Sequence, residues 1–262
     1  MQFPVCLPNN KEVMVKQILL KDMKCLSLYA QSSVSQFLKF LESFIITKNL
    51  NALEKFLALL LVRKYCVDDS ISIKAEKGSV KIKLDHILDN IGNIQDIKQT
   101  VTLNDVNFVL NYPTQFNSGN YDSMLTVIES IHMGDDQITL AELTDNELNK
   151  VLNTLPKKLY SYLEKYAKQN KQYFTINFWK GRERLGIEEA SLHLLSPEVS
   201  LLLARLFDMV NIETYCDYIF ILSQRIPDAN FLSNCTMKDL DQFLVLYQQE
   251  NRRREEAAKN PK

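Results

Sequence analysis

Hydrophobic side chains alternate with polar ones in three pairs of short runs, and this pattern predicts three β-hairpins. The first pair surrounds residues 8–11 (PNNK), the second surrounds residues 76–78 (EKG), and the third is joined at Asn104 and Asp105. Each junction has the residue types that form tight turns. The predicted strands cover residues 3–7 and 13–15, 71–73 and 80–84, and 97–103 and 106–110.

Helical periodicity occupies much of the remaining chain. Residues 50–66 are apolar on most sides, through Phe56, Leu57 and Leu60 among others, so we expect the central buried helix there. Thr144 and Glu147 have the spacing of a capping box, which predicts the start of another helix. Apolar stripes predict helices over residues 20–29, 37–44, 87–91, 121–131, 144–155, 157–169, 196–206, 211–226 and 236–247, and a short strand over 137–140.

The composition changes after residue 171. Residues 172–179 are rich in aromatic side chains, and residues 180–186 are polar and contain two glycines. We therefore expect an α+β fold in which a helix-rich N-terminal domain with inserted β-hairpins is followed by an all-α C-terminal domain. The expected boundaries are 1–171 for the first domain, 172–195 for an aromatic and polar linker, and 196–262 for the helical domain with its charged tail.

The charge balance argues against general binding of nucleic acids. The chain has 262 residues, with Lys+Arg 31 against Asp+Glu 32, for a formal net charge of -1. A general DNA or RNA binder needs an excess of cations to neutralise phosphates and release their counterions. With 46% hydrophobic residues, a chain of this length can instead bury a core without disulfides or metal ions. We therefore expect protein partners and no nucleic acid.

The cysteines and the apolar runs favour a cytosolic protein. Five cysteines are an odd number, and no two have the CxxC spacing, which is typical of a reducing compartment. Residues 1–20 mix charged and amide side chains into their apolar run, unlike a signal peptide. The longest apolar stretch, residues 56–62, is far shorter than the roughly 20 residues that span a bilayer. We expect no integral membrane association.

The sequence lacks the motifs of common enzymes. Neither GxGxxG nor GxxxxGK[ST] occurs, and His86, His132 and His193 each lack a second His or Cys within helical reach. We therefore expect no cofactor, no metal and no enzymatic activity. One catalytic alternative stays open, a cysteine hydrolase that pairs Cys216 or Cys235 with His193, although burial among aromatic residues makes a thiol inert.

Aromatic residues are the most informative candidates for binding a partner. The chain contains 13 Phe, 11 Tyr and 1 Trp, with clusters at residues 173–179 and 215–220. Aromatic anchors dominate the energetics of protein interfaces, although the same residues also fill hydrophobic cores. The candidate partner-binding residues are Trp179, Tyr215, Tyr218, Phe243 and Tyr247.

Several segments resemble a known phage family. Residues 3–13 (FPVCLPNNKEV) and 19–24 (LLKDMK) resemble the strand, LP turn, strand and helix that open members of the T4-type phage baseplate hub family. Residues 128–131 leading to 138–144, and residues 147–156, resemble its short strand, its helix start and its helix that ends at LP. The resemblance covers roughly residues 1–170.

The C-terminal part adds a second resemblance. Residues 218–228 (YIFILSQRIPD) are similar to the extension of the longer branch of this family, the baseplate hub assembly catalysts. The resemblance implies a late phage protein in the host cytoplasm that binds hub proteins during assembly of the contractile-tail baseplate, without bond-making residues. Two alternatives remain beside this assembly factor: a structural hub subunit retained in the tail, and the cysteine hydrolase.

Overall fold

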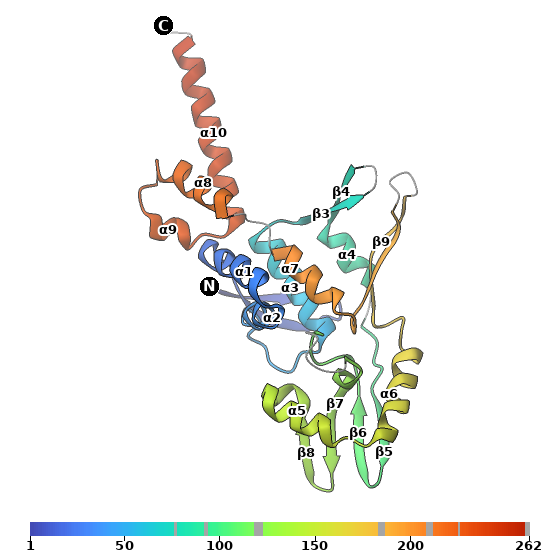
Figure 1. Cartoon of the computed structure of the whole chain (residues 1–262). Helices are drawn as coiled ribbons and strands as arrows, with labels where there is room; N and C mark the ends of the chain where they lie inside the picture. The colour runs from blue at the N-terminus through green and yellow to red at the C-terminus, as the bar shows by residue number, and fades with distance from the viewer. Residues whose placement is uncertain are drawn as a thin grey trace.

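The computed structural model describes residues 1–75, 78–91, 94–117, 123–182, 187–207, 212–224 and 226–259. It combines helices with small antiparallel sheets, as the periodicity predicts (Figure 1). The helices are α1 (Leu20–Ser32), α2 (Val34–Glu42), α3 (Ala52–Cys66), α4 (Leu84–Ile91), α5 (Asp145–Thr154), α6 (Lys157–Gln169), α7 (Glu198–Phe207), α8 (Ile212–Ser223), α9 (Ala229–Ser233) and α10 (Met237–Lys259), with 3₁₀ helices η1 (Ser123–Val127) and η2 (Leu140–Glu142). The strands are β1 (Gln2–Cys6), β2 (Glu12–Lys16), β3 (Ser70–Ala75), β4 (Gly78–Lys83), β5 (Gln99–Leu103), β6 (Val106–Leu110), β7 (Ile128–Met133), β8 (Asp136–Thr139), β9 (Thr175–Arg182) and β10 (Ile187–His193).

The three predicted hairpins are confirmed. Strands β1 and β2, β3 and β4, and β5 and β6 each pair antiparallel with their neighbour in the sequence. In the third hairpin, Leu103 pairs with Val106 across a two-residue turn. Asn104 and Asp105 have φ angles of 50 and 62°, in the left-handed region that a type I′ turn requires and that Asn and Asp tolerate.

The third hairpin belongs to a four-stranded sheet with the order β5-β6-β7-β8. Its third strand, β7, lies where the sequence predicts the end of a helix over residues 121–131, and that prediction is wrong for residues 128–131. Residues 123–127 form the 3₁₀ helix η1, and residues 121 and 122 lie outside the described part. Ile128 and Ile131 are buried, and Ile131 pairs with Phe108 of β6. A short apolar run fits a helix or a strand equally well, and here pairing on both sides decides for the strand.

Helix α3 is the central buried element, as the sequence predicts. Phe56, Leu57 and Leu60 are fully buried, and the first hairpin, α2, α4 and α10 all contact this helix. The hydrophobic core around it is one cluster that extends from Val5 to Leu240. Side chains from both sides of the expected domain boundary therefore share a core.

A buried arginine joins α3 to the C-terminal part of the chain. Arg63 is fully buried, and its Nε donates a hydrogen bond of 2.8 Å to the carbonyl of Leu206 in α7. Its Nη1 donates to the carbonyls of Asp68 and Ser70, both at 2.8 Å. Burial lowers the pKa of the guanidinium, whereas the carboxylates of Asp68 and Asp69 act in the opposite direction. The charged group thus holds α7 against the turn after α3.

The linker expected over residues 172–195 is replaced by a β-hairpin. Strands β9 and β10 pair antiparallel, with Ile176 opposite Leu192. Phe174 and Ile176 are buried, and the ring of Phe174 meets those of Tyr112 and His193 edge-on at 5.9 Å. Residues 173–177 alternate between half-buried and buried positions, which is the pattern of a strand on a core. The division into two folding domains stays a prediction.

The C-terminal helices are attached to α1 and α3 by polar contacts. The amide of Leu20 donates to the carbonyl of Cys235 at 2.9 Å, and Lys21 Nζ donates to Asn234 Oδ1 at 2.6 Å. Lys238 Nζ donates to the carbonyl of Lys64 at 2.9 Å. From this base, α10 extends away from the rest of the molecule (Figure 1). Within the described ranges, every helix is too short or too polar to cross a membrane.

Replacing Arg63 tests whether the buried guanidinium holds α7 in place. We expect Arg63→Met to lower the free energy of unfolding by about 3 kcal/mol, because buried carbonyl groups lose their hydrogen-bond donors. Urea denaturation followed by circular dichroism measures this. The matched control is Arg253→Met on the exposed surface of α10, which we expect to change stability by less than about 0.5 kcal/mol. Equal effects of the two substitutions would contradict the structural role of Arg63.

Candidate partner-binding surface

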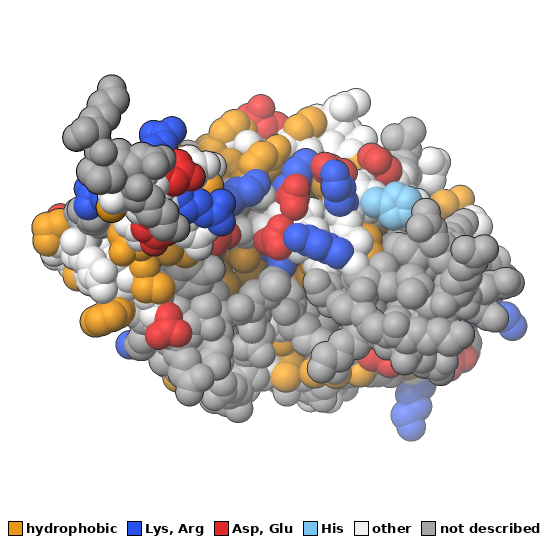
Figure 2. Space-filling model, turned by 90° about the horizontal axis from the view of Figure 1, so that it is seen from above, with side chains coloured by type: hydrophobic (Ala, Val, Ile, Leu, Met, Phe, Trp, Pro, Cys, Tyr) orange, Lys and Arg blue, Asp and Glu red, His pale blue; other side chains and the backbone are white. Residues whose placement is uncertain are grey.

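The C-terminal helices expose several large apolar side chains. Phe220 and Ile221 of α8, Phe231 of α9, and Val245 and Leu246 of α10 are all exposed, with Phe220 at 69% and Leu246 at 61%. Figure 2 shows orange side chains among charged ones on the left, where these helices lie. Exposed apolar groups concentrated on one part of a surface are typical of a protein-binding site.

Helix α10 is positioned by the chemistry of its first turn. The amide of Thr236 donates to Asp239 Oδ2 at 2.9 Å, and the amide of Asp239 donates to Thr236 Oγ1 at 3.2 Å. These reciprocal bonds confirm the box-like helix start that the sequence predicts. Leu240 is fully buried one turn later and joins the helix to the core. The helix is therefore fixed at its base, and its later turns carry the exposed residues.

One side of α10 forms a shallow open groove of about 490 Å³. Val245 and Leu246 lie on it, flanked by Lys238, Asp241 and Gln242. Sequence analysis did not select Val245 and Leu246, although a signal exists. Residues 243–246 (FLVL) are four consecutive apolar residues in an otherwise polar helix, and four consecutive positions cannot all face one core.

Two of the predicted partner-binding residues contact neighbouring helices. The half-buried ring of Phe243 lies 6.2 Å from that of Phe231 in α9. The hydroxyl of Tyr247 donates to Gln224 Oε1, just after α8, at 3.4 Å. Both side chains hold the C-terminal helices together, and their role in binding a partner stays a prediction.

The other three candidates have side chains outside the described residues. The backbone of Trp179 lies in β9, opposite Ala190 of β10. Tyr215 and Tyr218 lie in α8. The structure therefore places the three residues on two separate elements, and their proposed contacts stay predictions.

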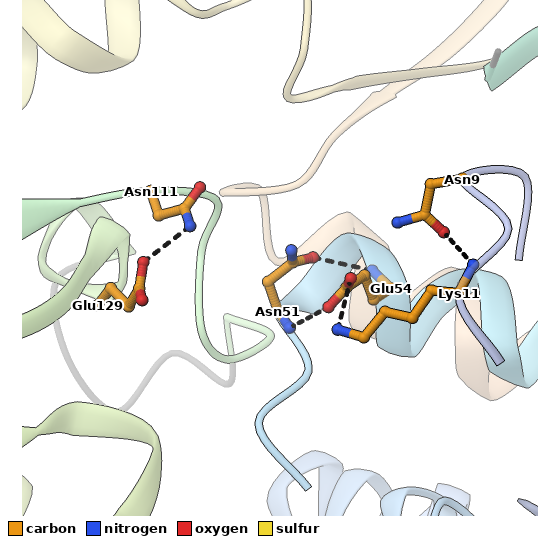
Figure 3. A network of polar contacts seen from close by, with 6 residues as sticks. All are labelled: Asn9, Lys11, Asn51, Glu54, Asn111 and Glu129. Carbon is orange, nitrogen blue, oxygen red and sulfur yellow. Dashed lines mark hydrogen bonds and ion pairs between the residues drawn. The ribbon is translucent and has the colours of Figure 1, made fainter. Parts of the chain in front are cut away.

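A polar cleft of about 370 Å³ lies between the first hairpin, the start of α3 and the four-stranded sheet. On one wall, Lys11 Nζ and the amide of Asn51 donate to Glu54 at 2.8 and 3.1 Å (Figure 3). On the other, Asn111 Nδ2 donates to Glu129 Oε2 at 2.8 Å. Donors engage both carboxylates. The contacts of Glu54 tie the start of α3 to the first hairpin, and the contact of Glu129 ties β7 to Asn111.

The described residues do not assemble the hydrolase site that the sequence left open. Cys235 is buried, its Sγ lies 3.3 Å from the carbonyl of Phe231, and burial raises the pKa of its thiol. His193 instead accepts a hydrogen bond from the amide of Leu195 at 3.3 Å and packs on Phe174. Each side chain is engaged by a different part of the fold. The side chain of Cys216 lies outside the described residues.

Metal ligands do not gather in the described part of the chain. There, no group of three or more His, Cys, Asp or Glu side chains is arranged to hold a metal ion.

The environment of His193 predicts a pH-dependent stability. Burial, and secondarily the charge of Lys171, lower the pKa of this imidazole. The unfolded chain, with an ordinary pKa of about 6.5, therefore takes up the proton more readily than the folded chain. The contribution of His193 to stability is present above about pH 6.5 and is lost as the pH falls below it.

Urea denaturation at pH 7.5 and pH 5.5 measures this loss. We expect His193→Gln to reduce the difference in stability between the two pH values. His86→Gln, a substitution at an exposed histidine of α4, is the matched control and should leave the difference unchanged. The same difference in His193→Gln as in the unsubstituted chain would contradict the role of His193.

Comparison with known proteins gives one family. A sequence model described as T4 bacteriophage base plate protein matches residues 1–180. Comparison with curated proteins and with solved structures gave no match. The matched residues include the first hairpin, α3 and the four-stranded sheet, whereas the exposed apolar residues of α8, α9 and α10 lie beyond them. Because the match covers more than half of the 262 residues, the chain belongs to the T4 bacteriophage base plate protein family.

Proposed function

We propose that this protein is a non-enzymatic assembly factor for the central hub of a phage baseplate. It binds hub subunits in the host cytoplasm during tail assembly and is absent from the mature particle. Membership of the base plate family supports a role in this assembly. The resemblance of residues 218–228 to the hub assembly catalysts supports the choice of an assembly factor over a retained structural subunit.

The observation that carries the proposal is the exposed apolar surface of α8, α9 and α10. Val245 and Leu246 are 52% and 61% exposed, on a helix that extends from the body of the molecule. Covering a leucine side chain stabilises a complex by about 2 kcal/mol. A hub subunit that covers these residues gains this free energy while it is bound.

The shape of α10 suggests how the contact is made. Val245 and Leu246 form an exposed apolar strip on α10, and a helix that presents such a strip fits a hydrophobic groove on its partner. Gln242 is exposed beside Val245 and Leu246 and offers a polar side chain to the partner. In this proposal Tyr215, Tyr218, Phe243 and Tyr247 belong to the helices that make this contact, and Trp179 of β9 contacts the partner at a second place. The next subunit to join the hub replaces the assembly factor at the same apolar surface.

A charge placed on the strip tests the proposal. We expect Leu246→Glu to weaken binding to hub subunits at least tenfold, because a carboxylate would be buried in an apolar contact. Binding is measured by titrating the purified chain with the hub proteins of the same phage. The control is Gln248→Glu, which adds the same charge at an exposed position on another side of α10.

The control should bind hub subunits within twofold of the unsubstituted chain. Circular dichroism and thermal melting should be unchanged in both variants, because neither position is buried. If Leu246→Glu binds hub subunits as tightly as the control does, the apolar strip is not the interface and the proposal fails.

A further inference from the structure

Within the described residues, β5 is the first strand in the order β5-β6-β7-β8, so it forms an open edge of the four-stranded sheet. The turn at Asn104 and Asp105 makes Leu103 and Val106 a hydrogen-bonded pair. Hydrogen-bonded and non-hydrogen-bonded pairs alternate along antiparallel strands, so Thr100 and Thr102 direct their backbone N–H and C=O groups away from β6.

These outward groups are available to another strand. Among the described residues, neither Thr100 nor Thr102 makes a backbone hydrogen bond to another element, and both residues are exposed. The Thr102 hydroxyl lies 2.6 Å from Asn107 Oδ1 across the pair, as expected for non-hydrogen-bonded residues whose side chains lie close together. An unpaired row of donors and acceptors is the template for adding a strand.

A groove of about 320 Å³ runs along this edge, between β5 and α6. Tyr162, Lys165, Tyr166 and Gln169 form its helical wall. The buried Tyr166 donates a hydrogen bond of 3.0 Å to the carbonyl of Ile97, just before β5, and so fixes the spacing between helix and strand. The groove is therefore formed before a ligand arrives, which lowers the cost of binding.

The positive charge beside the groove favours an acidic ligand. Helix α6 contains four lysines and one glutamate, and Lys165 is exposed at the groove. Tyr162 is 44% exposed beside it and offers an aromatic surface for an apolar side chain. A segment with alternating acidic and apolar residues would match both features, since successive side chains of a strand point to opposite faces.

We propose that the groove between β5 and α6 binds an extended, acidic segment of a partner protein, which joins the sheet as an additional strand beside β5. This mode of recognition takes affinity from main-chain hydrogen bonds and specificity from the neighbouring side chains. It is independent of the role proposed for the C-terminal helices, because no residue of α8, α9 or α10 lines the groove within the described part of the chain.

Two synthetic ten-residue peptides test the charge requirement on the full chain. One alternates valine with glutamate and the other alternates valine with lysine. We expect the glutamate peptide to bind at least tenfold more tightly, as measured by fluorescence anisotropy. Lys165→Glu should reduce this preference at least fivefold, whereas Lys157→Glu, at an exposed lysine of α6 away from the groove, should not.

Hydrogen exchange on the unsubstituted chain tests the strand addition itself. The glutamate peptide should slow exchange of the Thr100 and Thr102 amides, and Thr100→Pro, which removes an outward N–H, should weaken binding at least fivefold. The proposal is overturned if neither peptide binds at millimolar concentration, if both bind equally, or if the two amides exchange as fast with the peptide as without it. Dimerisation of the chain through β5 would also overturn it.

Discussion

Arg63 brings a positive charge into the hydrophobic core, and the placement of α7 against α3 depends on it. A buried charge is tolerated when its hydrogen-bonding groups are satisfied. Here the carbonyls of Leu206, Asp68 and Ser70 accept from the guanidinium. Because one acceptor belongs to α7 and two follow α3, the same group fixes both elements. The helices that carry the exposed apolar residues follow α7 in the chain.

The other end of α3 is held by a second polar cluster. Glu54 caps the helix through the amide of Asn51 and accepts from Lys11 of the first hairpin. Between these two polar ends, α3 is surrounded by apolar side chains. Apolar burial supplies most of the stability in such an arrangement, and the directional contacts at the two ends fix the register of the hairpin and of α7 on the helix. The matched family region therefore holds α3 in a fixed position, and the exposed helices attach to this region.

Local chemistry explains which parts of the fold could be predicted. The hairpin turn at Asn104 and Asp105 and the capping box at Thr144 are decided by residues close in sequence, and both predictions are confirmed. Strand β7 depends on pairing with β6 and β8, and the hairpin of β9 and β10 depends on the core that receives Phe174; neither is visible in a short window. The candidate site, too, could be predicted only in part from residues close in sequence. Aromatic composition pointed to α10, but the exposure of Val245 and Leu246 depends on how that helix packs.

We propose that the protein assists assembly of the hub and then leaves it. Quantitative mass spectrometry of purified phage particles and of infected-cell lysate tests it most directly, with this chain counted against a known hub subunit. The account predicts abundant protein in the lysate and far less than one copy per particle. A fixed whole-number ratio to the hub subunit in purified particles would contradict it and would identify the chain as a structural component of the baseplate.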